Sequence, residues 1–382
     1  MIPYSHQVIG EDDLRAVAKA LRSDWLTQGP EVLRFEKALA KYSGARYAVA
    51  FSHGTAALHA AFFAAGLKRG DEFITTPLTF AATANAGVWQ GAKPIFADVE
   101  WDTGNINPHE VEKKISNLPR SRRGKLKAIV AVDYSGVPVR LDEFKKMAHK
   151  HNLIFIEDAA HALGATYKGK KIGALADMTM FSFHPVKSIT TGEGGAILTN
   201  NKEWYEKMLL FRNHGITKNP KLLKKKNQGK WYYEMQALGL NYRMTDMQAS
   251  LGFSQLKKLT KFISARRVVA KRYMQAFRNE KNIILPYEAS YGRSAWHLFP
   301  IRLVNPKKRP FVFKKLQEAG IGAQVHYIPV YLHPYYKKLG YKKGLCPNAE
   351  RFYASEISIP IFPSLSIKEQ NYIIKKIKEL FE

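Results

Sequence analysis

Short apolar runs alternate with segments of helical periodicity through most of the first two hundred residues, and this alternation restricts the fold more than any other feature. Runs that are apolar at nearly every position are typical of strands in a parallel sheet covered by helices on both faces. We predict strands at residues 47–51, 73–75, 94–96, 128–133, 153–157, 178–183 and 195–199. The helices predicted between them are 55–65, 81–90, 108–114 and 141–151. The sequence therefore predicts an α/β protein with a mostly parallel, seven-stranded sheet.

Helical patterns flank this region on both sides. Two helices, 11–23 and 31–42, precede the first strand, and a long helical pattern over 244–277 follows the sheet. The remaining chain mixes predicted strands at 296–303 and 323–326 with predicted helices at 310–319 and 368–380. We therefore expect a large domain, residues 1–245, and a smaller C-terminal α/β domain, residues 246–382, as a chain of 382 residues favours.

The formal net charge of +28 indicates an anionic partner, which could be a nucleic acid, a membrane surface or a small substrate. The sequence has no zinc-finger, basic-zipper or aromatic RNA-binding motif. It also has no apolar run of the roughly 20 residues that span a bilayer. We expect neither a nucleic-acid nor a membrane partner. A phosphate-bearing small substrate is one explanation of the charge, and a general excess of lysine is the other.

Cysteine usage bears on the compartment. The single cysteine, Cys346, excludes an internal disulfide framework and a cysteine zinc cluster, and we expect no metal site. The first residues, MIPYSHQVIGEDD, lack the charged and then apolar layout of a signal peptide. We therefore expect a cytoplasmic protein.

Ligands of parallel sheets bind at the carboxyl ends of the strands, and polar residues follow two of the predicted strands there. After residues 47–51 comes Ser52-His53-Gly54-Thr55, where a helix begins whose free N–H groups suit a phosphate. After residues 153–157 comes Asp158, whose buried carboxylate needs a cationic partner such as a protonated pyridine nitrogen. The alternatives are a capped helix without a ligand for the first site and a salt bridge or helix cap for Asp158.

A third site lies in the stretch FSFHPVKSITTGEGG, residues 181–195, where Lys187 stands between a strand end and a glycine-rich turn. A lysine forms a Schiff base with an aldehyde only as a neutral amine, so burial or a nearby cation must lower its pKa. Pyridoxal 5′-phosphate (PLP) requires such a lysine together with an acidic partner for its ring nitrogen. Taken alone, Lys187 is equally an ordinary solvated lysine. The three sites together predict a PLP crevice.

Motifs along nearly the whole chain resemble those of the DegT/DnrJ/EryC1/StrS sugar aminotransferases. They include LTQGPEVLRFEKALAKYSG, SHGTAALHAA, TTPLTFAATANA, IEDAAHALGA, FSFHPVKSITTGEGGA and GLNYRMTDMQASLGFSQL. The likeness is greatest to the branch of the family in the pseudaminic acid pathway, because of HPVKSITTGEGGA and AQVHYIPVY (residues 323–331). The resemblance implies fold-type-I PLP architecture, with a large PLP-binding domain and a small C-terminal domain.

The resemblance also implies roles for individual residues. Lys187 matches the lysine that bonds to the cofactor and carries the proton, and Asp158 matches the acid at the ring nitrogen. His161 matches a contact to the ring hydroxyl, and Phe80 matches the aromatic that stacks on the ring, although both residues alone would also suit a core. The phosphate-site positions are matched by Thr55, Ala56, Ser182 and, from a neighbouring subunit, Asn241.

For the substrate, the resemblance implies a homodimer with shared active sites that moves an amino group from L-glutamate to the C4 keto group of a UDP-linked 4-keto-6-deoxy-N-acetylhexosamine. Lys187 stands where related dehydratases have histidine, so transamination is expected. Another nucleotide 3- or 4-keto sugar is one alternative substrate, and a non-catalytic PLP-fold regulatory or binding protein is the other reading. Candidate substrate contacts, which could equally be packing residues, are Tyr4, His6, Thr27, His326 and Tyr327.

The most basic local stretch, TKNPKLLKKKNQGK at residues 217–230, has two interpretations. It is either a solvated, flexible loop or, as the resemblance suggests, a segment that approaches the other subunit's active site. In the second case we expect its lysines to attract the diphosphate of the nucleotide sugar.

Overall fold

The computed structural model describes residues 1–381 and confirms the predicted seven-stranded sheet. The strand order is β1-β9-β8-β5-β4-β2-β3, and β9 pairs antiparallel with both of its neighbours while the other pairs are parallel. The seven strands are β1 (Tyr47–Phe51), β2 (Glu72–Thr75), β3 (Lys93–Phe96), β4 (Leu126–Val132), β5 (Ile154–Asp158), β8 (Met178–Ser182) and β9 (Gly195–Thr199).

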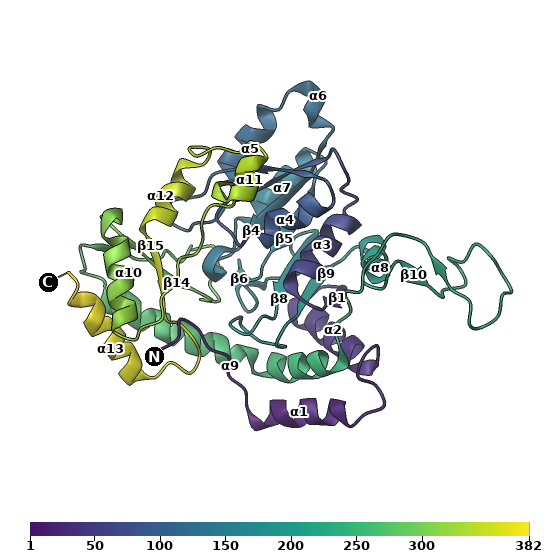
Figure 1. Ribbon diagram of the computed structural model, residues 1–382, viewed down its shortest axis with the longest axis horizontal. Coiled ribbons are helices and arrows are strands. Elements are labelled where there is room, and N and C mark those ends of the chain that lie inside the picture. Colours follow the sequence, from purple (N-terminus) through teal and green to yellow (C-terminus); the bar gives the residue numbers. More distant parts are fainter. Residues whose placement is uncertain (382) are drawn as a thin grey trace.

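Helices cover both faces of this sheet (Figure 1). Alternate side chains of β4 enter different cores: Ile129 and Ala131 pack with the helices of one face, and Ala128 and Val130 pack with those of the other. This two-sided burial explains why the strands read as continuous apolar runs. One face carries α2 (Pro30–Ser43), α7 (Leu141–Lys150) and α9 (Asp246–Ala276), and the other carries α3 (Gly54–Ala64), α4 (Ala82–Trp89) and α8 (Lys202–Phe211).

The C-terminal region forms a smaller antiparallel sheet in the order β12-β14-β15. Its strands are β12 (Ile283–Ile284), β14 (Phe299–Leu303) and β15 (Glu356–Ile359), with α10 (Arg309–Glu318) and α13 (Ile367–Lys378). The strand predicted at 323–326 was wrong, because only Gln324 forms an isolated bridge, to Ser358. The strand predicted from residue 296 starts at Phe299, since Trp296 has a left-handed φ of 49°.

Shorter elements complete the chain. They are α1 (Glu11–Leu21), α5 (Pro108–Ser116), α6 (Arg120–Arg123), α11 (Pro334–Lys338), α12 (Pro347–Ser355), β6 (Thr166–Tyr167), β7 (Lys170–Lys171), β10 (Ile216–Thr217), β11 (Glu234–Met235), β13 (Gly292–Arg293) and the 3-10 turns η1 (Tyr134–Gly136), η2 (Pro306–Lys308) and η3 (Val330–Leu332). The β10–β11 hairpin extends far from the body of the molecule (Figure 1). None of the helices within residues 1–381 is both long and apolar enough to cross a membrane.

The long helix α9 connects the two halves of the chain along one side of the molecule (Figure 1). Its residues up to Ile263 pack on the large sheet, and its residues from Val269 onward pack on the small sheet. A separate apolar group, here called the junction cluster, joins side chains from both halves. It contains Leu78, Ala84, Phe96, Val99, Tyr134, Val330, Tyr331, Tyr336, Cys346, Ala349 and Phe352. The division into 1–245 and 246–382 stays a prediction.

Gly195 positions the start of α3 against the sheet, because a Cβ there would lie 2.7 Å from Cα and 2.8 Å from N of Gly54. We predict that Gly195→Ala lowers the free energy of unfolding by about 1–3 kcal/mol, since backbone atoms on both sides would have to move. Urea denaturation measures this. Gly124→Ala is the control, since its Cβ would meet no atom within 4 Å. Equal stability of the two variants would contradict the prediction.

Candidate active site

The carboxyl ends of β1, β5 and β8 meet at a cavity of about 680 Å³. Asp158 ends β5, Ser182 ends β8, and α3 begins three residues after β1. The loop between β8 and β9 carries Lys187. The cavity brings together most of the residues predicted from sequence, namely Tyr4, Thr55, Phe80, Asp158, His161, Ser182, Lys187, His326 and Tyr327.

Four predicted residues do not line this cavity. The N–H of Ala56 donates to Nδ1 of His53, the residue that caps α3. His6 packs beside the ring of Phe362, and Thr27 forms an isolated bridge with Thr245. Asn241 is exposed and forms a bridge with Asn213, next to the base of the projecting hairpin. Their assigned roles stay predictions.

Lys187 is partly exposed toward the cavity and otherwise enclosed by protein. Burial is the main cause that lowers its pKa from 10.5 to about 8; Asp158 opposes this effect and the Arg266 cation adds to it. Arg266 itself is 1% exposed, and its guanidinium donates to backbone carbonyls, including that of Val186 at 3.2 Å. Roughly a tenth of Lys187 is therefore the neutral amine at pH 7, far more than for an ordinary lysine, and nucleophilic attack on an aldehyde requires this form.

Asp158 is 3% exposed, and burial raises its pKa. Its carboxylate accepts hydrogen bonds from the Thr83 hydroxyl at 2.7 Å and from the Ala160 N–H at 3.2 Å. Thr83 comes from the first turn of α4 and also contacts the hydroxyl of Thr79. These bonds fix the orientation of Asp158, while no ion pair neutralises it within residues 1–381. The carboxylate therefore faces the cavity as an acceptor for a cation.

The start of α3 is shaped for an anion. Gly54 lies against Ser182, since a Cβ at Gly54 would come within 3.2 Å of the Ser182 hydroxyl. Thr55 follows in the first helical turn and lines the cavity. The unpaired N–H groups and positive dipole of a helix start favour a phosphate there.

Three histidines surround the amine, and sequence reasoning missed one of them. His297 Nε2 lies 3.3 Å from Lys187 Nζ, and the rings of His297 and His161 are 4.4 Å apart. His161 Nε2 lies 3.1 Å from the Tyr327 hydroxyl, and His326 Nδ1 lies 2.8 Å from the Ser358 hydroxyl. Burial lowers the pKa of all three, to about 3 for His326, so they are neutral. The sequence feature that could have identified His297 as a site residue is its position as a polar residue between Trp296 and the apolar strand β14.

Comparisons with known proteins agree with this geometry. The profile described as the DegT/DnrJ/EryC1/StrS aminotransferase family matches residues 7–378. The chain belongs to this family.

Several members are similar over their full length. The spore coat polysaccharide biosynthesis protein SpsC of Bacillus subtilis is 38% identical, covering 99% of this chain and 97% of its own. A UDP-4-amino-4,6-dideoxy-N-acetyl-beta-L-altrosamine transaminase of Campylobacter jejuni is 42% identical, and the match covers 98% of this chain and 96% of the relative. The solved structure of Helicobacter pylori PseC, an aminotransferase of pseudaminic acid biosynthesis, superposes with a TM-score of 0.91 at 35% identity. The superposition covers 100% of this chain and 99% of PseC.

As a member of the DegT/DnrJ/EryC1/StrS family, the protein is a PLP-dependent sugar aminotransferase, and the predicted fold class and cofactor are confirmed. The residues of the cavity fit PLP. The unneutralised Asp158 would receive the protonated ring nitrogen, and the α3 start would receive the phosphate. Nδ1 of His161 is buried without a hydrogen-bond partner within residues 1–381 and is available for the ring hydroxyl. Phe80 is 64% exposed at the cavity, where a cofactor ring would cover it.

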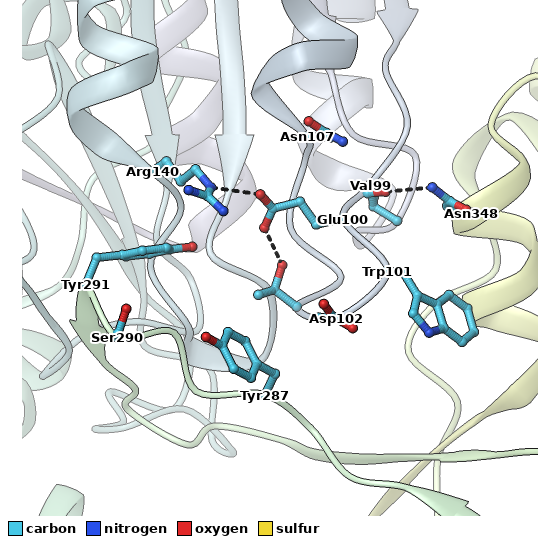
Figure 2. Close-up of a pocket in the computed structure, with 11 residues that line it drawn as sticks. Val99, Glu100, Trp101, Asp102, Asn107, Arg140, Tyr287, Ser290, Tyr291 and Asn348 are labelled. Atoms are coloured by element: carbon cyan, nitrogen blue, oxygen red, sulfur yellow. Dashed lines mark hydrogen bonds and ion pairs between the residues drawn. The ribbon is translucent and has the colours of Figure 1, made fainter.

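A second cavity, of about 440 Å³, shares no lining residue with the first (Figure 2). Glu100 pairs with Arg140 at 2.8 Å, and Asp102 adds a second carboxylate to the lining. Tyr287 and Tyr291 also line the cavity, and the Arg140 guanidinium lies 5.2 Å from the centre of the Tyr291 ring (Figure 2). Carboxylates thus outnumber the cation, which makes this cavity unsuited to phosphate groups.

The lowered pKa of Lys187 predicts its reactivity as a function of pH. In cofactor-free protein, trace acetylation of Lys187 should rise with pH to a midpoint of about 8 and then level off. A free lysine peptide has its midpoint near 10.4. The labelling rises with pH because only the neutral amine reacts. Its midpoint lies low because burial favours the neutral form. Peptide mass mapping measures the labelling, and a midpoint near 10.4 would contradict the prediction. The charged and titratable groups around Lys187 are Asp158, His161, His184, Arg266, His297, His326 and Tyr327.

Proposed function

We propose that the enzyme transfers an amino group from L-glutamate to the C4 keto group of a UDP-linked 4-keto-6-deoxy-N-acetylhexosamine. The product would be UDP-4-amino-4,6-dideoxy-N-acetyl-β-L-altrosamine, a precursor of pseudaminic acid. The observation that carries the proposal is a lysine amine with a pKa of about 8 in one cavity with Asp158 and the start of α3. The substrate is supported by the names of the Campylobacter and Helicobacter relatives.

One relative points to a second candidate substrate. SpsC is 38% identical and its name refers to a spore coat polysaccharide, so another nucleotide 3- or 4-keto sugar is the alternative. A non-catalytic role is disfavoured, because Lys187, Asp158 and the helix start are all present together in the cavity.

In the proposed mechanism, Lys187 would hold the cofactor through Nζ, and its free amine would act on the bound amino donor. Bound PLP supplies an electron sink for the negative charge that develops on the substrate carbon. Lys187 Nζ takes the proton from the donor Cα, and in the reverse direction the same atom gives a proton to C4 of the sugar. Asp158, which lines the cavity, would keep the ring nitrogen protonated. Thr55 and Ser182 would hold the phosphate, with Ala56 beside them in the first turn of α3.

The remaining lining residues suit a sugar. The ring of Phe80 lies 6.4 Å from that of Tyr327, and the ring of Tyr4 lies 5.8 Å from that of His326. An apolar wall with a few fixed polar groups is typical of small-molecule sites. We propose Tyr4, His326 and Tyr327 as sugar contacts, with His6 and Thr27 as more distant candidates. The single cysteine, which is buried, supports a cytoplasmic location.

We further propose a homodimer with shared active sites. The projecting hairpin exposes large apolar side chains, with Trp231 71%, Met235 65% and Leu238 84% exposed. Apolar groups gathered on a protruding segment are typical of a surface covered by a partner. In the dimer, Asn241 of one chain would reach the phosphate bound by the other chain.

The experiment that tests the function follows the absorbance of the purified protein. We expect a yellow chromophore that glutamate bleaches and that one UDP-4-keto sugar of a panel restores, with the product assigned by NMR. Lys187→Ala should abolish the covalent adduct, which borohydride reduction and peptide mapping detect at residue 187. A wild-type protein without that adduct, or a Lys187→Ala enzyme with full turnover, would refute the proposal.

The basic stretch gives a separate prediction. The N–H groups of Lys224 and Lys225 both bind the Glu234 carboxylate at 2.8 Å, which orders the turn while their amines make no ion pair within residues 1–381. Replacing Lys224, Lys225 and Lys226 by alanine should raise KM for the nucleotide sugar and flatten the salt dependence of KM, because charge attraction to the diphosphate is lost.

Steady-state kinetics at several salt concentrations measure this effect. A variant with alanine at the exposed Lys127, Lys145 and Lys146 removes the same charge from elsewhere and should keep the wild-type KM. An unchanged KM in the Lys224–Lys226 variant would rule out the role of the stretch in substrate binding.

A further inference from the structure

His297 has an unusual set of contacts for a buried histidine. Its side chain is 2% exposed, and Nε2 lies 3.3 Å from Lys187 Nζ. Nδ1 is buried and has no hydrogen-bond partner within residues 1–381. A histidine that serves packing alone normally has its polar atoms bonded to the surrounding protein. The imidazole of His297 instead makes its one side-chain hydrogen bond, within the same residues, to the amine of Lys187.

We propose that His297 is a positioning residue for Lys187, whose neutral Nε2 accepts a hydrogen bond from the ammonium group that forms when Lys187 takes up the substrate proton. The inference rests on the proposed function, because it gives Lys187 the role of proton carrier. The proton moves from the donor Cα to Nζ, and Nζ would then pass it on to the cofactor to complete the amino transfer. His297 takes up no proton and only accepts the hydrogen bond.

The backbone holds His297 in place by a contact between distant segments. The N–H of His297 donates to the carbonyl of Ser135 at 2.9 Å, and the N–H of Ala295 donates to that of Gly136 at 3.0 Å. Both Trp296, with φ of 49°, and Ser135, with φ of 56°, adopt left-handed backbone. Such strained residues persist where the surrounding structure requires them, often at active sites. A Cβ at Gly136 would come within 3.0 Å of the Trp296 nitrogen, so the close approach needs glycine.

Arg266 fixes the two partners relative to each other. Its guanidinium donates to the carbonyl of His297 at 3.3 Å and to that of Val186, the residue before Lys187, at 3.2 Å. A third bond, at 2.8 Å, reaches the carbonyl of Ile361. One buried side chain of α9 therefore positions the backbones of both the amine and its acceptor.

The charges around Lys187 explain why the acceptor is needed. Burial and the Arg266 cation disfavour the ammonium form of Lys187, which nevertheless has to exist for a moment after each proton uptake. A hydrogen bond to a charged group is stronger than one between neutral groups, so Nε2 stabilises the ammonium more than the amine. Burial also lowers the pKa of His297 well below its usual value, and the ring therefore keeps its acceptor lone pair at neutral pH.

Two substitutions separate hydrogen bonding from packing. His297→Gln retains an acceptor near the position of Nε2, and His297→Leu removes it while filling similar space. His59→Gln is the matched control, since His59 is a buried histidine whose pKa burial lowers to about 4 and whose Nδ1 contacts Tyr242. Thermal unfolding and bound cofactor confirm that each variant is folded. If His297→Leu does not fold, His297→Asn, whose shorter amide ends short of Nε2, takes its place.

The first measurement titrates Lys187 in holoenzyme that glutamate has converted to the aminated cofactor form. Trace acetylation with peptide mapping should show a lower pH midpoint in His297→Leu than in wild type, because the ammonium loses its acceptor. His297→Gln and the control should keep the wild-type midpoint. An unchanged midpoint in His297→Leu would overturn the proposal.

The second measurement is the glutamate half-reaction in single turnover, with and without deuterium at Cα. His297→Leu should slow it roughly ten- to hundredfold, the effect of one hydrogen bond to a charge, and should raise the isotope effect. KM for the keto sugar should stay unchanged, and His297→Gln should restore most of the rate. Equal losses in the Gln and Leu variants would reduce His297 to a packing residue. A wild-type enzyme that forms no adduct at Lys187 would instead contradict the proposed function itself.

Discussion

Burial of charge at the ends of the central strands is the constraint on which the rest of the structure depends. Asp158 and Lys187 both lie where desolvation opposes ionisation, so each has a pKa displaced toward its neutral form. The fold can keep such groups only if fixed dipoles and hydrogen bonds surround them. Thr83 and the Ala160 N–H supply those contacts to Asp158, and His297 supplies one to Lys187, so the contacts come from widely separated parts of the chain.

Local sequence patterns predicted the seven-stranded sheet well because its strands are buried on both faces. The alternation of Ile129 and Ala131 with Ala128 and Val130 between two cores leaves no polar position to obscure the apolar run. Site residues that end a strand or start a helix could be predicted from the sequence for the same reason. Asp158, Ser182 and Thr55 were predicted in this way and line one cavity, and Lys187, on the loop after β8, lines it too.

Residues defined by long-range contacts could not be predicted. His297 meets Lys187 across 110 residues of sequence, and they are brought together by the crossing at Ser135 and Gly136 and by the bonds of Arg266. Arg266 lies within a helix whose pattern gives no sign of its carbonyl partners. In the C-terminal region, pairing decides which segments become strands: β14 has β15 as its partner, while residues 323–326 have a single bridge and stay irregular.

The junction cluster has a consequence for how the enzyme selects substrates. It places Tyr331 and Phe352 from the C-terminal half in one apolar core with Phe96 of β3 and Tyr134 of η1. The Tyr134 hydroxyl also donates to the carbonyl of His326 at 2.6 Å, within the wall of the cavity. Separating the two halves would expose this apolar core to water, which favours keeping them together. The wall of the cavity is therefore tied to the packing of the junction cluster, so a substitution in that core would alter the shape of the pocket from a distance.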